Sequence, residues 1–188
     1  MIFESHAHYD DEAFDEDRSE LLDALPAQGI GRVINVCAEV EGWDRTVDLM
    51  ERYPYIYGAV GVHPDDVGAL DEEKIRRMHQ ICQMEKTVAV GEIGLDYYWD
   101  TSTKATQETM LRAQLELALE LDLPVIIHDR EAHGDSLRIV CDYPGLRGVF
   151  HCFSGSVEMA RELLRRGWYL GFDGPITYKN AVKALDVI

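Results

Sequence analysis

Residues 88–96 read VAVGEIGLD, an apolar run that carries one carboxylate in its interior and a second at its end. A short apolar and β-branched segment of this kind predicts a β-strand. Glu92 follows three apolar or small residues, so we expect its side chain to point into a strongly desolvated part of the fold. Because a buried carboxylate is costly unless a cation meets it, we also expect a cation beside Glu92.

Similar runs recur along the chain and alternate with helical patterns. The predicted strands are residues 2–8, 32–38, 56–63, 88–96, 125–128, 148–153 and 168–174. Helical periodicity lies between them, at residues 43–53, 71–84, 106–121 and 157–166, and Gly167 is the expected C-terminal cap of the last helix. Alternating strands and helices predict an α/β fold with parallel strands, either an open sheet or a closed barrel.

The polar residues at the strand ends distinguish these two folds. An open sheet usually binds its ligand through a glycine-rich loop after the first strand, but acidic residues without a glycine follow residues 2–8. Nearly every predicted strand instead ends in a possible ligand, namely His6, His8, His63, Glu92, His128, His151 and Asp173. A barrel gathers the carboxyl ends of its strands around one mouth. The sequence therefore predicts a TIM-type (βα) barrel, with residues 1–188 as a single domain.

The barrel is expected to be incomplete. Barrels of this type have eight units and about 250 residues, whereas seven strands are predicted and the sequence ends in AVKALDVI, within the helix after the seventh strand. About seven of the eight units are thus present, and the eighth strand and helix are expected to be missing. Such a barrel has two unpaired parallel edges and exposed interior side chains, which favour association or instability.

Composition and charge limit the function classes. The 188 residues are 46% hydrophobic and 28% charged, as in a globular protein, and their net charge is −17. This charge argues against nucleic-acid binding through a broad basic face, but it allows a nucleic-acid substrate held by metal ions in a small pocket. The four cysteines are widely spaced, and neither a membrane span nor a secretory signal is recognisable. We therefore expect a cytoplasmic protein without a membrane partner, and we infer no stable protein partner.

The histidines at the strand ends are candidate metal ligands. Residues i and i+2 of a strand point to the same face, so His6 and His8 offer two nitrogens to one metal. The two oxygens of Glu92 would be able to bridge two metals, with His128 and His151 completing the second site. A single strand-end histidine is more often structural, and we take that view of His79 on a helix, of His133 in a loop and, as a packing residue, of Cys152.

Several stretches resemble the TatD-related metal-dependent deoxyribonucleases of the amidohydrolase-like barrel group. They are SHAHYDD, VGVHPDD, VGEIGLDYY, VIIHDREA, HCFSGS and WYLGFDGPITYKN, in the family's order along the chain. The resemblance implies that a pair of divalent cations, zinc, magnesium or manganese, is bound by His6, His8, Glu92, His128 and His151. It further implies that His63 contacts the phosphate or substrate beside the catalytic Glu92, and that the guanidinium fork of Arg130 meets a phosphate.

This chain departs from the family pattern at two positions. Glu4 stands where the family usually has an aspartate, in a residue expected to support the first strand. The family also has a strand with an aspartate ligand after the seventh helix, and no residue of this sequence is assigned to that role. Asp173 does not match it by motif, although it is expected near the mouth.

The expected function is hydrolysis of DNA phosphodiester bonds, which the resemblance places at the 3′ end, by a water activated between two metals. One alternative is the same barrel acting on a non-nucleic ester or amide. Another is a catalytically impaired remnant that associates through its open edge. A nucleic-acid-binding module without catalysis is least supported, because no basic surface with interleaved aromatic residues is recognisable.

Overall fold

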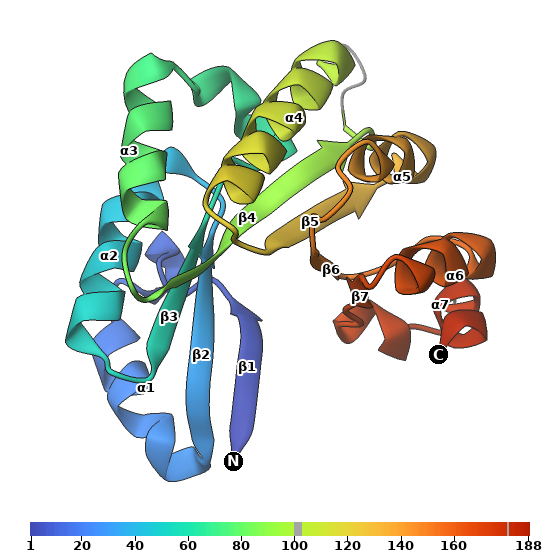
Figure 1. Cartoon of the computed structure of the whole chain (residues 1–188). Helices are drawn as coiled ribbons and strands as arrows, with labels where there is room; N and C mark the ends of the chain where they lie inside the picture. The colour runs from blue at the N-terminus through green and yellow to red at the C-terminus, as the bar shows by residue number, and fades with distance from the viewer. Residues whose placement is uncertain (100–102, 180) are drawn as a thin grey trace.

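Seven parallel strands form one curved sheet in this computed structural model, which describes residues 1–99, 103–179 and 181–188. The strands lie in chain order, and each pairs with the next (Figure 1). They are β1 (Ile2–Ala7), β2 (Ile30–Cys37), β3 (Ile56–Val60), β4 (Thr87–Asp96), β5 (Val125–Arg130), β6 (Gly148–Phe150) and β7 (Tyr169–Leu170). The α/β class and the seven barrel units predicted from the sequence are confirmed.

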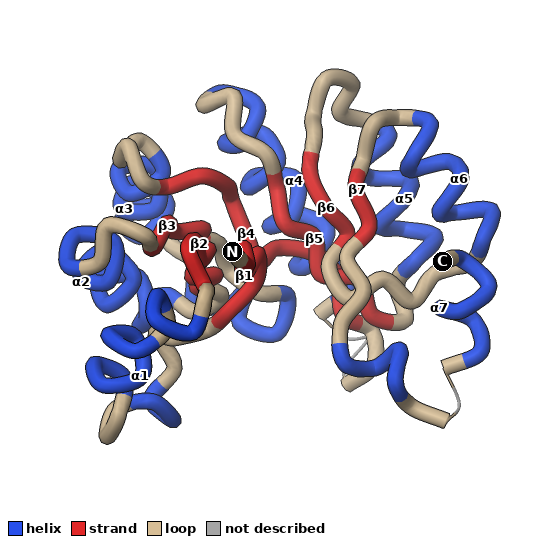
Figure 2. Tube along the Cα trace, turned by 90° about the horizontal axis from the view of Figure 1, so that it is seen from below, coloured by secondary structure: helices blue, strands red, loops and turns tan. Residues whose placement is uncertain are grey.

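Helices connect the strands and cover the outer face of the curved sheet (Figure 2). They are α1 (Arg18–Ala24), α2 (Trp43–Arg52), α3 (Glu72–Cys82), α4 (Lys104–Glu120), α5 (His133–Cys141), α6 (Val157–Arg165) and α7 (Val182–Val187). Capping residues account for two of the boundaries. The Asp71 carboxylate accepts a hydrogen bond from Lys74 N (2.9 Å) before α3, and Gly167, at φ 83°, follows the last turn of α6 as predicted.

The main hydrophobic core lies between the sheet and these helices. Leu111, Leu115 and Ala118 of α4 belong to the same buried cluster as Ile93 and Leu95 of β4. Burial of each leucine or isoleucine side chain stabilises the fold by about 1.5–3 kcal/mol. This core anchors β4, the strand that carries Glu92, against the longest helix of the described chain.

Two buried glutamines of α4 hold the chain where it leaves the sheet. The Gln107 side chain accepts from the backbone N–H of Asp96 and donates to its carbonyl, at 2.9 Å in both cases. Gln114 does the same at Val62, at 2.7 and 3.2 Å. These bonds satisfy backbone groups beyond the regular ladder, and so they hold the segments next to Asp96 and His63 in place.

Gly94 allows β4 and β5 to approach closely near the mouth. Its φ is 157°, and a Cβ atom built there would lie 1.9 Å from the carbonyl oxygen of His128. Only glycine fits such an approach. The glycine in GEIGLD therefore brings the backbone of His128 next to the strand of Glu92.

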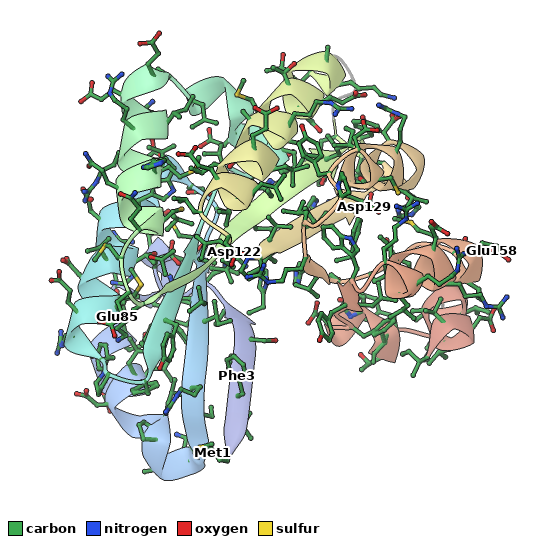
Figure 3. The ribbon with its side chains drawn as sticks, viewed as in Figure 1. Met1, Phe3, Glu85, Asp122, Asp129 and Glu158 are labelled. Carbon is green, nitrogen blue, oxygen red and sulfur yellow. The ribbon has the colours of Figure 1, made fainter. Side chains whose placement is uncertain are left out.

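Several element boundaries differ from the predictions. The strand predicted at residues 56–63 ends at Val60, and the strand predicted at 168–174 covers only Tyr169–Leu170. His63 and Asp173 thus lie in the loops beyond their strands. The prediction that His133 lies in a loop was wrong, because His133 begins α5 and its ring bonds the Asp129 carboxylate at 2.8 Å. Asp129 itself lies near the end of β5 (Figure 3).

The sheet does not close within the described residues, because β1 and β7 each pair on one side only. The exposed Phe3 marks the free edge at β1 (Figure 3), and Tyr169 lies at the other free edge. A cavity of about 760 Å³ lies on the concave face and is lined by residues of all seven strands. The two unpaired edges expected from the sequence are therefore present. Within the described residues, no helix is long and apolar enough to cross a membrane.

Candidate metal centre

The Glu92 carboxylate is the centre of a cluster at the carboxyl ends of the strands. The residue is 5% exposed. Its Oε2 lies 3.2 Å from His6 Nε2 and 3.9 Å from His8 Nε2, while its Oε1 lies 2.8 Å from His128 Nδ1. Each oxygen therefore faces different imidazoles, one set on the β1 side and one on the β5 side. The desolvated position expected for Glu92 is observed.

His6 and His8 face the same point, as residues i and i+2 at the end of a strand should. Their Nε2 atoms lie 3.1 Å apart. The Nδ1 atom of His8 lies 2.7 Å from the Val36 carbonyl oxygen and must donate to it, which leaves the Nε2 of the neutral ring with a free lone pair. Glu4 supports this arrangement, since its carboxylate accepts a hydrogen bond from His6 N at 3.1 Å.

Two groups of three residues bring possible ligand atoms within 4.8 Å of one another. The first contains His6, His8 and Glu92, and the second contains His63, Glu92 and His128. Glu92 belongs to both. His63, which the sequence suggested as a substrate contact, thus lies among the possible ligands, and its ring contacts that of His128 with centroids 4.2 Å apart.

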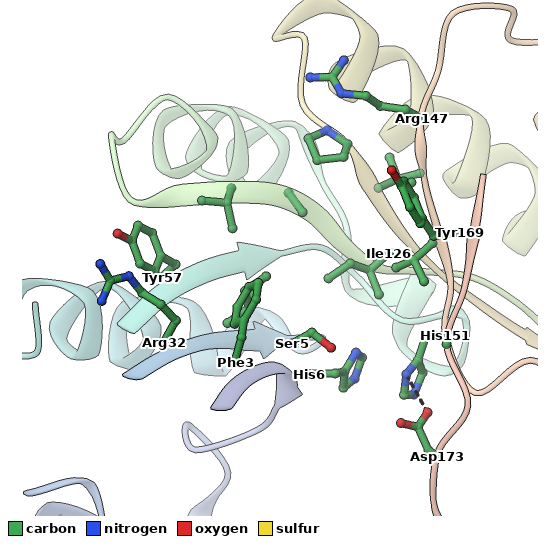
Figure 4. Close-up of a pocket in the computed structure, with 18 residues that line it drawn as sticks. Phe3, Ser5, His6, Arg32, Tyr57, Ile126, Arg147, His151, Tyr169 and Asp173 are labelled. Carbon is green, nitrogen blue, oxygen red and sulfur yellow. Dashed lines mark ion pairs between the residues drawn. The ribbon is translucent and has the colours of Figure 1, made fainter. Parts of the chain in front are cut away.

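His151 lies beside these groups and belongs to neither of them. Its ring stacks on the ring of His6, with centroids 3.6 Å apart and planes at 7°. Its Nδ1 lies 3.2 Å from Asp173 Oδ2, and Figure 4 shows this pair facing His6 across the opening. The predicted position of Asp173 near the mouth is confirmed, and His151 occupies the β6 side of the cluster.

Asp96 is a polar neighbour that the sequence reasoning did not assign. Its side chain is 1% exposed, and its Oδ2 lies 3.0 Å from His128 Nε2. Asp96 is the last residue of the VAVGEIGLD run, so a carboxylate at the end of the strand that carries Glu92 was the available signal. With Glu92 on Nδ1 and Asp96 on Nε2, the His128 ring is oriented at both nitrogens.

The charges of the cluster follow from burial and these contacts. Burial by itself would raise the pKa of Glu92, but the hydrogen bonds of His128 and His6 outweigh it and hold this pKa far below its ordinary value. Burial would likewise lower the pKa of His128, and the bond to Glu92 outweighs it and raises this pKa. Burial and the facing His6 ring lower the pKa of His151 to about 4, and burial lowers that of His63.

This donor set fits divalent cations. An ionised, buried carboxylate faces imidazoles on both of its oxygens, and His63 and His151 are neutral near pH 7. Neutral imidazole and carboxylate are the ligands that zinc and other first-row divalent metals prefer. The carbonyl contact of His8 and the carboxylate contact of His128 resemble the outer contacts that orient metal-bound histidines.

Arg130 lies at the end of β5 and connects this centre to an aromatic pair. Its Nη1 is 3.9 Å from Asp96 Oδ2, and its Cζ lies 3.8 Å from the ring centroid of Tyr98 and 5.3 Å from that of Trp99. A cleft of about 690 Å³ opens beside it and is lined by His128, Arg130, His151 and Asp173, among others. Three of the predicted site residues, His128, Arg130 and His151, therefore line one cleft.

Comparison with known proteins agrees with this geometry. A family model described as TatD-related DNase matches residues 3–188. The uncharacterized metal-dependent hydrolase YabD of Bacillus subtilis is 39% identical over 190 residues, which cover 100% of this chain and 74% of YabD. The 3′-5′ ssDNA/RNA exonuclease TatD of Cronobacter turicensis is 37% identical over 165 residues, which cover 86% of this chain and 62% of that protein.

A solved structure extends the likeness to three dimensions. The crystal structure of YjjV, a TatD homologue from Escherichia coli K12, superposes with a TM-score of 0.90 at 34% identity, covering 99% of this chain and 73% of that one. The chain therefore belongs to the family of TatD-related DNases and is a metal-dependent hydrolase.

Proposed function

We propose that this chain hydrolyses phosphodiester bonds of single-stranded nucleic acid, DNA in the first place, and removes nucleotides from the 3′ end. The observation that carries the proposal is the position of Glu92, whose two oxygens face separate sets of imidazoles at 2.8 and 3.2 Å. A carboxylate so placed is suited to joining two metal positions, an arrangement used to cleave phosphate esters. The Cronobacter relative named as an exonuclease supports the choice of substrate.

In this proposal His6 and His8 would hold one divalent cation, His63, His128 and His151 would lie at a second, and Glu92 would belong to both donor groups. The nitrogen-rich donor set favours zinc over magnesium and manganese. Bound divalent cations supply Lewis acidity and positive charge at the phosphoryl group. Among the chain's own groups, Arg130 offers a guanidinium to phosphate oxygens at the rim of the cleft.

The position of His63 suits it for contact with the substrate. Its side chain is 19% exposed at the opening, and its Nδ1 accepts a weak hydrogen bond from Asp65 N at 3.3 Å, which turns Nε2 away from that loop. The ring contacts that of His128, so His63 would lie beside a substrate bound at the second donor group.

Glu92→Gln is the decisive test because it keeps the shape of the side chain and removes its charge. We expect the purified wild-type chain to hold about two divalent ions by elemental analysis and to release nucleotides from a single-stranded oligonucleotide. Glu92→Gln should lose metal and lower that rate by about 100-fold or more. Glu158→Gln on α6 (Figure 3), an exposed glutamate away from the cluster, is the matched control and should match the wild type. Equal activity of Glu92→Gln and the wild type would contradict the proposal.

A second candidate function is that the same centre acts on a small ester or amide. The net charge of −17 favours it, because an acidic surface repels a polyanion such as DNA but not an uncharged substrate. The two candidates differ in substrate preference. A comparison of oligonucleotides with aryl esters, lactones and aminoacyl esters at equal concentrations distinguishes them, and a higher kcat/KM on any uncharged ester would favour the second.

A further inference from the structure

Two exposed aromatic side chains lie beside Arg130, close to the candidate metal centre. Tyr98 and Trp99 follow β4 directly, are 54% and 71% exposed, and contact each other edge to face with centroids 4.7 Å apart. The other two tryptophans of the chain, Trp43 and Trp168, are 2% and 4% exposed. Large aromatic side chains are usually buried in the fold or in contact with a binding partner. The exposure of Tyr98 and Trp99 therefore suggests that a partner binds them.

The pair is held in place by the residues that support the cluster. The carboxylate of Asp96 accepts a hydrogen bond from Tyr98 N at 2.8 Å through Oδ1, while its Oδ2 contacts His128 Nε2 at 3.0 Å. One carboxylate therefore links the aromatic segment to a candidate metal ligand. Since Asp96 is almost completely buried, it sets the position of Tyr98 relative to the centre.

Arg130 adds a cation between the rings and the centre. Its guanidinium lies over the Tyr98 ring at 3.8 Å and within 5.3 Å of the Trp99 ring. It also lines the cleft, and its side chain remains 43% exposed. Arg130 thus lies between the two aromatic rings and Asp96, which contacts the candidate ligand His128. A nucleotide offers the complementary order, with a flat base at one end and a phosphate at the other.

We propose that Trp99, supported edge to face by Tyr98, forms a stacking platform for a nucleobase of a single-stranded substrate, with Arg130 facing the adjoining phosphate. The proposal rests on the proposed function, because it deepens the substrate choice of the same centre. Stacking requires an open base face, which a single strand offers and a base within a duplex does not. It would also supply affinity without a basic surface, in agreement with the net charge of −17.

Tryptophan fluorescence tests the platform directly, because Trp99 is the exposed tryptophan. The probes are an oligodeoxyadenylate octamer with phosphorothioate linkages that resist hydrolysis, an abasic octamer of the same backbone, and a duplex of the same length. We expect the octamer alone to quench the fluorescence. Trp99→Leu should abolish the response and weaken octamer binding, measured by anisotropy, by about tenfold. Trp99→Phe keeps an aromatic face and should stay within about threefold of the wild type.

Tyr169→Leu is the matched control, since Tyr169 is equally exposed but lies on β7. It should bind the octamer as the wild type does. On a hydrolysable oligonucleotide, Trp99→Leu should raise KM by about tenfold and leave kcat unchanged, whereas a merely structural role would lower metal content or stability instead.

The outcomes separate this proposal from the proposed function. Nucleotide release without quenching, or equal quenching by the abasic octamer, would overturn the platform and leave the nuclease activity standing. Base-dependent quenching without nucleotide release would support the platform and overturn the hydrolytic function. Acrylamide is the control for access to Trp99. If another protein segment covers Trp99, neither acrylamide nor the octamer will quench its fluorescence, and this result would also overturn the platform.

Discussion

The strands β1–β5 and the segment from β6 to α7 differ in how firmly they hold their parts of the centre. β4 has ten residues, all but one of them buried, whereas β7 has two residues, neither of them buried. Glu92 and His128 lie on the long strands, and each contacts two or more polar partners. His151 follows the three-residue β6, stacks on His6 and pairs with the half-exposed Asp173.

The candidate centre therefore has two halves that are held by different elements. Glu92 and His128 lie on β4 and β5, whereas His151 and Asp173 follow β6 and β7. On the side of β4 and β5, the α4 core and the glutamine bridges fix the ligand geometry before any metal arrives. On the side of β6 and β7, β6 pairs with β5, the His151 N–H bonds the Ile127 carbonyl at 2.9 Å, and the His151 ring stacks on that of His6. The first half therefore has the more extensive support, whereas the second is held by two short strands at the end of the sheet.

Deletion of a core side chain tests this difference in stability most strongly. Leu115 of α4 and Leu163 of α6 are both 0% exposed. We expect Leu115→Ala to lower the free energy of unfolding by about 4 kcal/mol and Leu163→Ala by about 2 kcal/mol, because the neighbours of α6 can relax into the space more readily. Urea unfolding followed by circular dichroism measures both values. The exposed Leu164→Ala is the control, and equal losses at 115 and 163 would show that the two regions unfold as one unit.

Removal of single imidazoles extends the comparison to the centre. We expect His128→Ala to weaken zinc or manganese binding by about 100-fold and His151→Ala by about tenfold, since His128 contacts Glu92 and Asp96 whereas His151 lies outside both donor groups. Competition with a chelator of known affinity measures the constants. His79→Ala on α3, whose ring faces Glu120 at 3.4 Å, should bind metal as the wild type does. A larger loss of metal affinity in His151→Ala than in His128→Ala would contradict this expectation.

Asp96 offers a finer test of preorganisation in the first half. Asp96→Asn keeps the bulk of the side chain and the bond to Tyr98 N, but it removes the charge facing His128 Nε2. We expect metal affinity to fall by about tenfold with little change in the midpoint of thermal unfolding. Calorimetric titration with zinc gives the affinity. Unchanged affinity together with lower stability would make Asp96 a purely structural residue.

The cysteines provide the gentlest probe, because two are buried in the first region and two lie after β5 and are partly exposed. Cys37 and Cys82 are buried in the first region, and burial raises the pKa of Cys82 to about 12 and that of Cys37 further still. Cys141 at the end of α5 and Cys152 just after β6 are partly exposed. At pH 8 a thiol reagent should therefore modify the latter two in the native protein and the former two only after urea is added. Mass spectrometry of the labelled peptides identifies the sites, and early labelling of Cys82 would show that the first region opens.

Much of the centre was predictable because the relevant patterns are local. The alternation of apolar strands with helical segments indicated parallel strands, and the same-face geometry of residues i and i+2 indicated that His6 and His8 converge. The isolated carboxylate in VAVGEIGLD indicated a buried charge that needs a partner. The helix α5 escaped prediction, and with it the bond from His133 to Asp129, because nine residues of mixed character carry a weak periodic signal.

Periodicity and residue type were sufficient to predict the class of fold, the strands whose ends carry candidate ligands and the chemical type of each candidate. Which of these candidate ligands lie together depends on the three-dimensional arrangement of the strands. The curvature and register of the sheet brought Glu92 between His6 and His128, placed His63 in a donor group and set His151 against the His6 ring. It also joined Asp96, Arg130 and the Tyr98–Trp99 pair into one rim. Distances between the ends of separate strands depend on long-range packing, which no local pattern encodes.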